Sequence, residues 1–107
     1  MKGMVTNMVH KIEQNNMQDA LKAKVAVVDF SATWCGPCRM QGPAVEKLAE
    51  EGYNVGKINV DDEGELAERY HVMNIPTLII FKNGEEKERM VGVQSKDLLE
   101  SKLKALA

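Results

Sequence analysis

Residues 25–38 read V-A-V-V-D-F-S-A-T-W-C-G-P-C, and the organisation of the whole chain follows from this stretch. Its first six residues are apolar on both faces except at Asp29 and rich in β-branched side chains, which predicts a central strand covered on both sides. The strand leads to Cys35 and Cys38, the only cysteines of the chain. With a Gly-Pro turn between them, the two thiols are close enough to form a small disulfide ring. The pair can therefore exist in an oxidised and a reduced state.

The residues around the pair indicate how it reacts. Pro37 is tolerated at the first position of a helix, and the residues behind it keep helical spacing, so Cys35 is expected at a helix N-terminus. Unpaired N–H groups and the positive end of the helix dipole stabilise a thiolate there and lower the pKa of the thiol. Cys38 is expected one turn deeper, shielded and positioned to attack Cys35 in a mixed disulfide. The pattern predicts one attacking and one resolving thiol.

Length and composition limit the remaining classes. The 107 residues are 44% hydrophobic and 28% charged, as expected for one domain over residues 1–107. A formal charge of -2 argues against a nucleic-acid partner. The first residues lack the apolar core of a signal peptide and no stretch is long enough to span a membrane, so a cytoplasmic location without membrane contact is expected. A zinc site usually needs four ligands, and besides the two cysteines the chain offers only His10 and His71, with no second pair of closely spaced ligands, so redox chemistry is favoured over metal binding.

The rest of the chain alternates between strand and helix patterns. A helix between the first two central strands makes those strands parallel. Asn83-Gly84 predicts a two-residue hairpin into an antiparallel edge strand. Asn15 or Asn16 is available as the N-cap of the first helix, and Ser95 as the N-cap of the last. Strands are expected around residues 5–10, 25–30, 55–60, 77–81 and 87–91, and helices over residues 16–24, from the cysteines to 51, 65–70 and from 95 onward. The pattern predicts an α/β fold with a mixed sheet of about five strands flanked by four helices.

Two helices have a predicted core face. Apolar side chains at helical spacing mark these faces. In the helix after the cysteines they are Met40, Ala44, Val45, Leu48 and Ala49. In the last helix they are Leu98, Leu99, Leu103 and Leu106.

W-C-G-P-C after V-V-D-F resembles the active site of the thioredoxin family, and the resemblance extends over nearly the whole chain, least clearly over residues 1–24. It implies the thioredoxin fold and a protein disulfide reductase that donates electrons to cellular enzymes. It also implies no bound cofactor, protein disulfides as substrates, and re-reduction by a flavin- and NADPH-dependent or a ferredoxin-linked reductase. Nothing in the sequence requires more than a monomer.

Three residues outside the cysteine pair are candidates for catalysis. Burial in an apolar strand raises the pKa of a carboxyl group, and the resemblance makes Asp29 the acid that takes the proton from Cys38. Lys57, on the neighbouring strand, is the candidate partner of Asp29. The alternative to proton transfer is that Asp29 has only a structural role, as a cap or as one half of an ion pair with Lys57. Pro76 stands at the start of a buried strand, and the resemblance makes it a cis-proline facing the dithiol.

The resemblance also implies an apolar collar around Cys35 that binds protein substrates with broad specificity. Its members are Trp34, Gly36, Pro37, Ile75, Pro76, Val91, Gly92 and Val93. Gln41, Gly42, Met73 and Asn74 depart from the family's usual residues and are expected to affect partner choice and redox poise.

Two other functions remain open. One is a thiol oxidase or isomerase, against which Gly36-Pro37 argues, because a histidine between the cysteines is the usual route to a more oxidising couple. The other is a binding module in which redox activity is incidental. Such a module would keep its partner function after both cysteines were changed to serine.

Overall fold

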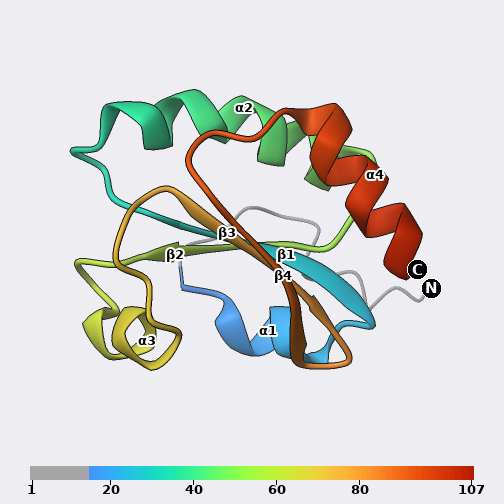
Figure 1. The fold of residues 1–107 in the computed structure, drawn as a ribbon, viewed down its shortest axis with the longest axis horizontal. Coiled ribbons are helices and arrows are strands. Elements are labelled where there is room, and N and C mark those ends of the chain that lie inside the picture. The colour runs from blue at the N-terminus through green and yellow to red at the C-terminus, as the bar shows by residue number, and fades with distance from the viewer. Residues whose placement is uncertain (1–14) are drawn as a thin grey trace.

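The computed structural model describes residues 15–107, in which strands and helices alternate (Figure 1). The strand expected around residues 5–10 lies outside this range, so the described sheet has four strands and not about five. The helix and strand order predicted for the rest of the chain is confirmed, with bounds that move by one or two residues at most ends. The elements are α1 (Met17–Lys22), β1 (Val25–Ser31), α2 (Gly36–Glu50), β2 (Val55–Asn59), α3 (Gly64–Arg69), β3 (Thr77–Lys82), β4 (Glu85–Val91) and α4 (Lys96–Leu106).

The sheet is mixed, and its strands are ordered β2-β1-β3-β4. β1 and β2 run parallel, as expected for strands joined by a helix, whereas β3 runs antiparallel to both β1 and β4. The predicted hairpin joins β3 to β4, with φ 52° at Asn83 and φ 83° at Gly84. Two positive φ values are what a type I′ turn requires, which explains the Asn-Gly pair at this place.

Helices cover both faces of the sheet (Figure 1). On one face, α1 and α3 pack against the side chains of Ala26, Val28 and Phe30 in β1. On the other face, α2 and α4 pack against Val27 and its neighbours. Side chains alternate between the two faces of a strand, so Asp29 lies on the same face as Val27, beneath α2. The topology therefore places this carboxyl group under the helix that carries the cysteines.

The predicted core faces of α2 and α4 need correction. Met40 is 71% exposed, whereas its neighbour Gln41 is completely buried. The buried positions of α2 start at Cys38 and recur every three or four residues, a phase that includes residue 41 and turns residue 40 to solvent. Leu98 is likewise exposed on α4, whereas Leu99 is buried. Apolar character alone gave the wrong phase at both positions.

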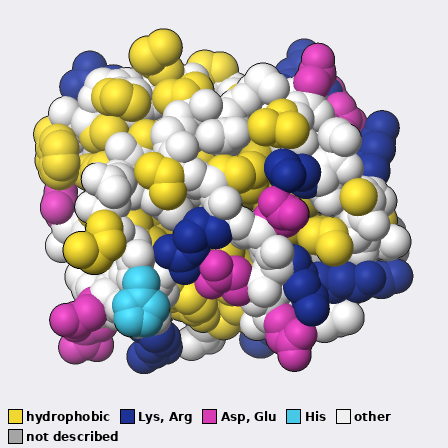
Figure 2. Space-filling view, viewed as in Figure 1, with side chains coloured by type: hydrophobic (Ala, Val, Ile, Leu, Met, Phe, Trp, Pro, Cys, Tyr) yellow, Lys and Arg dark blue, Asp and Glu magenta, His cyan; other side chains and the backbone are white. Residues whose placement is uncertain are grey.

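The two edges of the described sheet are protected in different ways. β4 has a run of charged residues from Glu85 to Arg89. On the face of the molecule shown in Figure 2, charged side chains lie mainly in the lower and right-hand parts, and apolar side chains lie mainly in the upper and left-hand parts. Charges on an edge strand discourage pairing with another chain. At β2, Asn59 and Lys57 donate backbone N–H bonds to the side-chain oxygens of Asn15 and Asn16. Both side chains therefore pair with β2, and the cap bond predicted for Asn15 or Asn16 is not formed by the N-cap residue Asn16.

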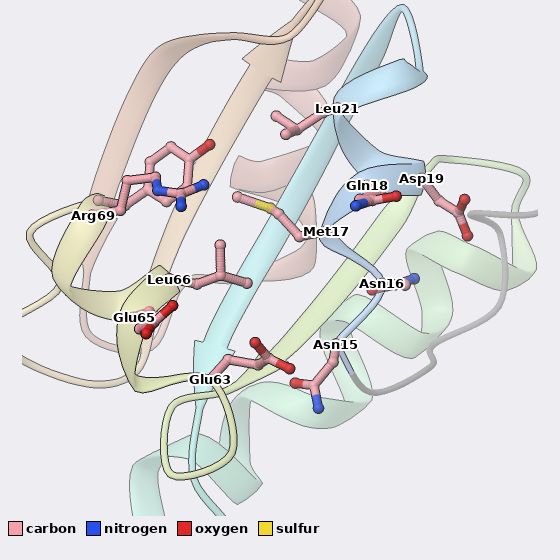
Figure 3. Close-up of a pocket in the computed structure, with 11 residues that line it drawn as sticks. Asn15, Asn16, Met17, Gln18, Asp19, Leu21, Glu63, Glu65, Leu66 and Arg69 are labelled. Carbon is pink, nitrogen blue, oxygen red and sulfur yellow. The ribbon is translucent and has the colours of Figure 1, made fainter.

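A hollow of 630 Å³ lies between α1 and α3 (Figure 3). Most of the side chains that line it are polar, including Asn15, Asp19 and Arg69. It lies in the helical layer on the face of the sheet opposite α2, so it takes no part in the cysteine site. Within residues 15–107, no helix has the length and apolar character needed to cross a membrane.

Candidate active site

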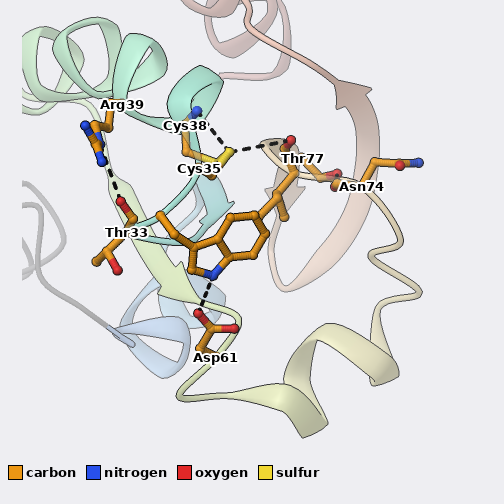
Figure 4. The surroundings of a disulfide bond; sticks show 9 residues. Thr33, Cys35, Cys38, Arg39, Asp61, Asn74 and Thr77 are labelled. Atoms are coloured by element: carbon orange, nitrogen blue, oxygen red, sulfur yellow. Dashed lines mark hydrogen bonds between the residues drawn. A yellow bond between two sulfur atoms is a disulfide. The ribbon is translucent and has the colours of Figure 1, made fainter.

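The cysteine pair lies where β1 gives way to α2 (Figure 4). Cys35 is the N-cap of α2, and Cys38 follows in the first turn, with Pro37 between them near the helix start as predicted. The two sulfurs form a disulfide, and the Cα atoms are 5.2 Å apart. The backbone N–H of Cys38 donates to the Cys35 sulfur over 3.2 Å. The helix N-terminus thus directs a hydrogen-bond donor at this sulfur, an arrangement that stabilises a thiolate in the reduced form.

The loop before β3 faces the pair. The Ile75–Pro76 peptide bond is cis, and the carbonyl oxygen of Ile75 lies 3.9 Å from the Cys35 sulfur. Ile75 also packs against the small apolar cluster formed by Ala32 and the two cysteines. The Pro76 carbonyl accepts the N–H of Gly92 over 2.8 Å, so the end of β4 is fixed beside the same loop. The fold therefore brings together three segments that are far apart in the sequence.

Asp29 is almost fully buried, with 1% of its surface exposed. Neither carboxylate oxygen has a hydrogen-bond partner among residues 15–107. Burial raises the pKa of Asp29 to about 7, and the positive charge of Lys57, opposite it on β2, acts in the other direction. A carboxyl group with this pKa exchanges a proton readily at neutral pH.

Trp34 lies next to Cys35 with 67% of its surface exposed. Its indole N–H donates to the Asp61 carboxylate over 2.7 Å, which joins the loop before α2 to the turn after β2 (Figure 4). No local pattern in the sequence indicates this contact, because it joins residues 27 positions apart. Asp61 fixes the ring plane of an exposed aromatic side chain beside the reactive sulfur.

The other predicted collar residues differ in accessibility. Val91 is 56% exposed and Val93 is 45% exposed. Gly36 and Pro37 are also exposed, whereas Ile75 and Gly92 are half-buried and Pro76 is buried. The accessible apolar surface thus comes mainly from Trp34 and the two valines. Among the residues that depart from the family's usual pattern, Met73 and Asn74 are exposed, Gly42 is half-buried and Gln41 is buried.

A metal centre finds no support in the described part of the chain. Among residues 15–107, no group of three or more His, Cys, Asp or Glu side chains is placed to hold a metal ion. His71 is exposed in the turn after α3, whereas His10 lies outside the described residues.

Comparisons with known proteins agree with this geometry. A family model described as Thioredoxin matches residues 8–105. Thioredoxin from Chlamydia pneumoniae is 46% identical over 94 residues, which cover 86% of this chain and 92% of that protein. Thioredoxin from Staphylococcus saprophyticus is 44% identical over 92 residues, which cover 83% of this chain and 88% of that protein. The solved structure of a mutant thioredoxin from Halobacterium salinarum NRC-1 superposes with a TM-score of 0.84 at 36% identity, covering 92% of each chain. The chain belongs to the thioredoxin family of protein disulfide oxidoreductases.

Proposed function

We propose that this chain reduces disulfide bonds in other proteins, with Cys35 as the attacking thiol and Cys38 as the resolving thiol. The observation that supports it most directly is the position of Cys35 at the N-cap of α2, where its sulfur accepts the N–H of Cys38. This donor and the helix dipole favour the thiolate, which is the nucleophile in disulfide exchange. Cys38 lies inside the first helical turn, next to the Cys35 sulfur, and in this disulfide form each cysteine is 6% exposed.

The reaction transfers two electrons and two protons to the target. In the reduced chain, the Cys35 thiolate attacks one sulfur of the target disulfide, that bond breaks, and the departing target sulfur takes up a proton. Cys38 then loses its proton and attacks the Cys35 sulfur, which releases the second target thiol. The chain is left with the Cys35–Cys38 disulfide, which is the state seen in the structure.

Asp29 is proposed to accept the proton of Cys38. Its carboxyl lies on the face of the sheet that α2 covers, and its pKa of about 7 lets it both take up and release a proton near neutrality. Lys57 favours the ionised carboxylate, which is the form that accepts a proton. Lys57 thus acts through Asp29 and not on the sulfur atoms.

The target chain is proposed to dock in an extended conformation beside Ile75 and Pro76. Proline has no N–H, so Pro76 leaves the neighbouring backbone groups of Ile75 to pair with the target. Trp34, Val91 and Val93 then contact apolar target side chains. Because these contacts demand area and not specific polar groups, one site serves many protein disulfides.

Turnover requires a donor that returns two electrons to the Cys35–Cys38 pair. A flavin- and NADPH-dependent reductase is the proposed donor, with a ferredoxin-linked reductase as the alternative. The chain is proposed to act as one domain and one monomer without a cofactor of its own, because the site lies within one chain. A reducing compartment such as the cytoplasm would keep the dithiol available.

Reduction of insulin disulfides, with dithiothreitol as electron source, tests this function. Wild-type protein should accelerate the reaction, and Cys35→Ser should abolish the acceleration. A second measurement, equilibration with a dithiol buffer, should give a reduction potential near about -270 mV, the value known for thioredoxin. A potential above about -180 mV would indicate an oxidase or isomerase and contradict the proposal.

A further inference from the structure

Gln41 is an amide side chain with no exposed surface in the core-facing phase of α2. It lies three residues after Cys38, on the same side of the helix. An apolar residue usually occupies such a position, because a buried amide is costly unless its polar atoms are hydrogen-bonded. The contacts of this side chain should therefore show what it does.

Both polar atoms of the Gln41 amide bond to the backbone of one residue. Gln94 donates its N–H to the Gln41 side-chain oxygen over 2.7 Å, and the Gln41 side-chain nitrogen donates to the Gln94 carbonyl over 2.9 Å. The two bonds fix the orientation of the amide, because a flipped amide would place donor against donor and acceptor against acceptor. Gln41 thus holds residue 94 much as a neighbouring strand would.

Residue 94 belongs to the segment between β4 and α4, which carries part of the docking surface. At one end of this segment, Gly92 donates its N–H to the Pro76 carbonyl over 2.8 Å. At the other end, the segment is held by the Gln41 amide. Between the two attachments lies Val93, which is 45% exposed, and Val91 directly precedes them. The exposed valines are therefore held against both the cis-proline loop and the cysteine-bearing helix.

We propose that Gln41 is a positioning residue that fixes the docking segment, residues 91–94, relative to the first turn of α2. The inference rests on the proposed reduction of protein disulfides. Gln41 acts through the backbone of Gln94 and not on the sulfur atoms. Its effect should therefore appear with protein substrates, which contact residues 91–93, and not with a small disulfide that needs only the Cys35 sulfur.

The test compares Gln41→Met with wild type and with Gln18→Met as the matched control. Methionine is similar in length to glutamine but makes neither bond to Gln94, and Gln18 is an exposed residue of α1, so the control makes the same chemical change on the other face of the sheet. Gln41→Met should raise the KM for insulin about tenfold, which corresponds to about 1.4 kcal/mol, with kcat nearly unchanged. The rate with the small disulfide 5,5′-dithiobis(2-nitrobenzoate) should stay within about twofold of the wild-type rate. The reduction potential should equal the wild-type value within the measurement error. The control should leave every value unchanged.

Hydrogen exchange gives a readout that a purely stabilising role would not produce. The Gln94 amide proton should lose protection in Gln41→Met while amides of β1 keep theirs. Gln41→Leu, which also removes both bonds to Gln94 and leaves an apolar side chain in the core, should raise the KM for insulin in the same way and serves if the first variant folds poorly.

The outcomes separate the inference from the proposed function. An unchanged KM for insulin in active Gln41→Met protein, or an equal loss with insulin and the small disulfide, would overturn the inference alone. Wild-type protein that fails to reduce insulin would overturn the proposed function and this inference with it.

Discussion

Replacing Asp29 by Asn should stabilise the oxidised protein at neutral and alkaline pH. Burial raises the pKa of Asp29 from 3.8 to about 7, with Lys57 opposing the shift. The folded chain therefore holds a proton that the unfolded chain releases, so the stability associated with this group is fully present below pH 3.8 and is lost as the pH rises to about 7. A shift of about 3 pH units corresponds to about 4 kcal/mol. This is an upper limit for Asn, because the Asp29 oxygens have no hydrogen-bond partner among residues 15–107 and a buried amide without partners is itself costly.

Urea unfolding of wild-type and Asp29→Asn protein, at intervals from about pH 5 to pH 8, measures this effect. The difference in the free energy of unfolding should be at most roughly 2 kcal/mol at pH 5 and should grow to at most about 4 kcal/mol at pH 8. Asp62→Asn, the same change at an exposed carboxylate, should keep the wild-type pH profile. Parallel curves for wild type and Asp29→Asn would refute the assignment of a raised pKa to Asp29, and with it the argument for its role as proton acceptor.

Three further changes test other parts of the site and the fold. Cys38→Ser should leave Cys35 reactive but unable to release its target, so a mixed disulfide should accumulate on a gel run without reductant. Asp61→Ala removes the acceptor of the Trp34 indole N–H. It should raise the KM for insulin about threefold and alter the fluorescence of this single tryptophan. Gly42→Ala should raise the free energy of unfolding by about 0.5 kcal/mol in a urea titration, because Gly42 lies inside α2 and an added Cβ would meet no atom within 4 Å.

The sequence predicted the fold well because each element carried a local signal. The apolar run before the cysteines, the Asn-Gly hairpin and the Ser95 cap all depend on neighbouring residues, and the structure has them in the predicted roles. Asn16 is the counterexample. Either its side chain or that of Asn15 was expected to cap α1, but both accept N–H bonds from β2, about 40 residues away, and no local pattern distinguishes the two partners.

The site was predicted where its chemistry is local and missed where it depends on tertiary contacts. The cysteine pair and the buried Asp29 could be recognised from adjacent residues, because spacing and an apolar strand are visible in the sequence. The bond from Trp34 to Asp61 and the bonds from Gln41 to Gln94 join residues 27 and 53 positions apart. For Gln41 a signal existed, since counting helical turns from Cys38 places it on the buried face, but apolar Met40 beside it was preferred.

The two polar side chains buried beneath and within α2 have opposite physical consequences. Gln41 has both polar atoms paired, so its burial costs little and its two bonds hold a backbone segment in place. Asp29 has neither oxygen paired within the described residues, so its burial destabilises the charged form and leaves the carboxyl free to exchange a proton. A bonded partner for Asp29 would stabilise the fold but would also move its pKa away from neutrality. Within residues 15–107, the unpaired carboxyl of Asp29 and the fully paired amide of Gln41 are therefore each suited to a different requirement of the proposed reaction, proton transfer at the sulfur and a fixed surface for the target.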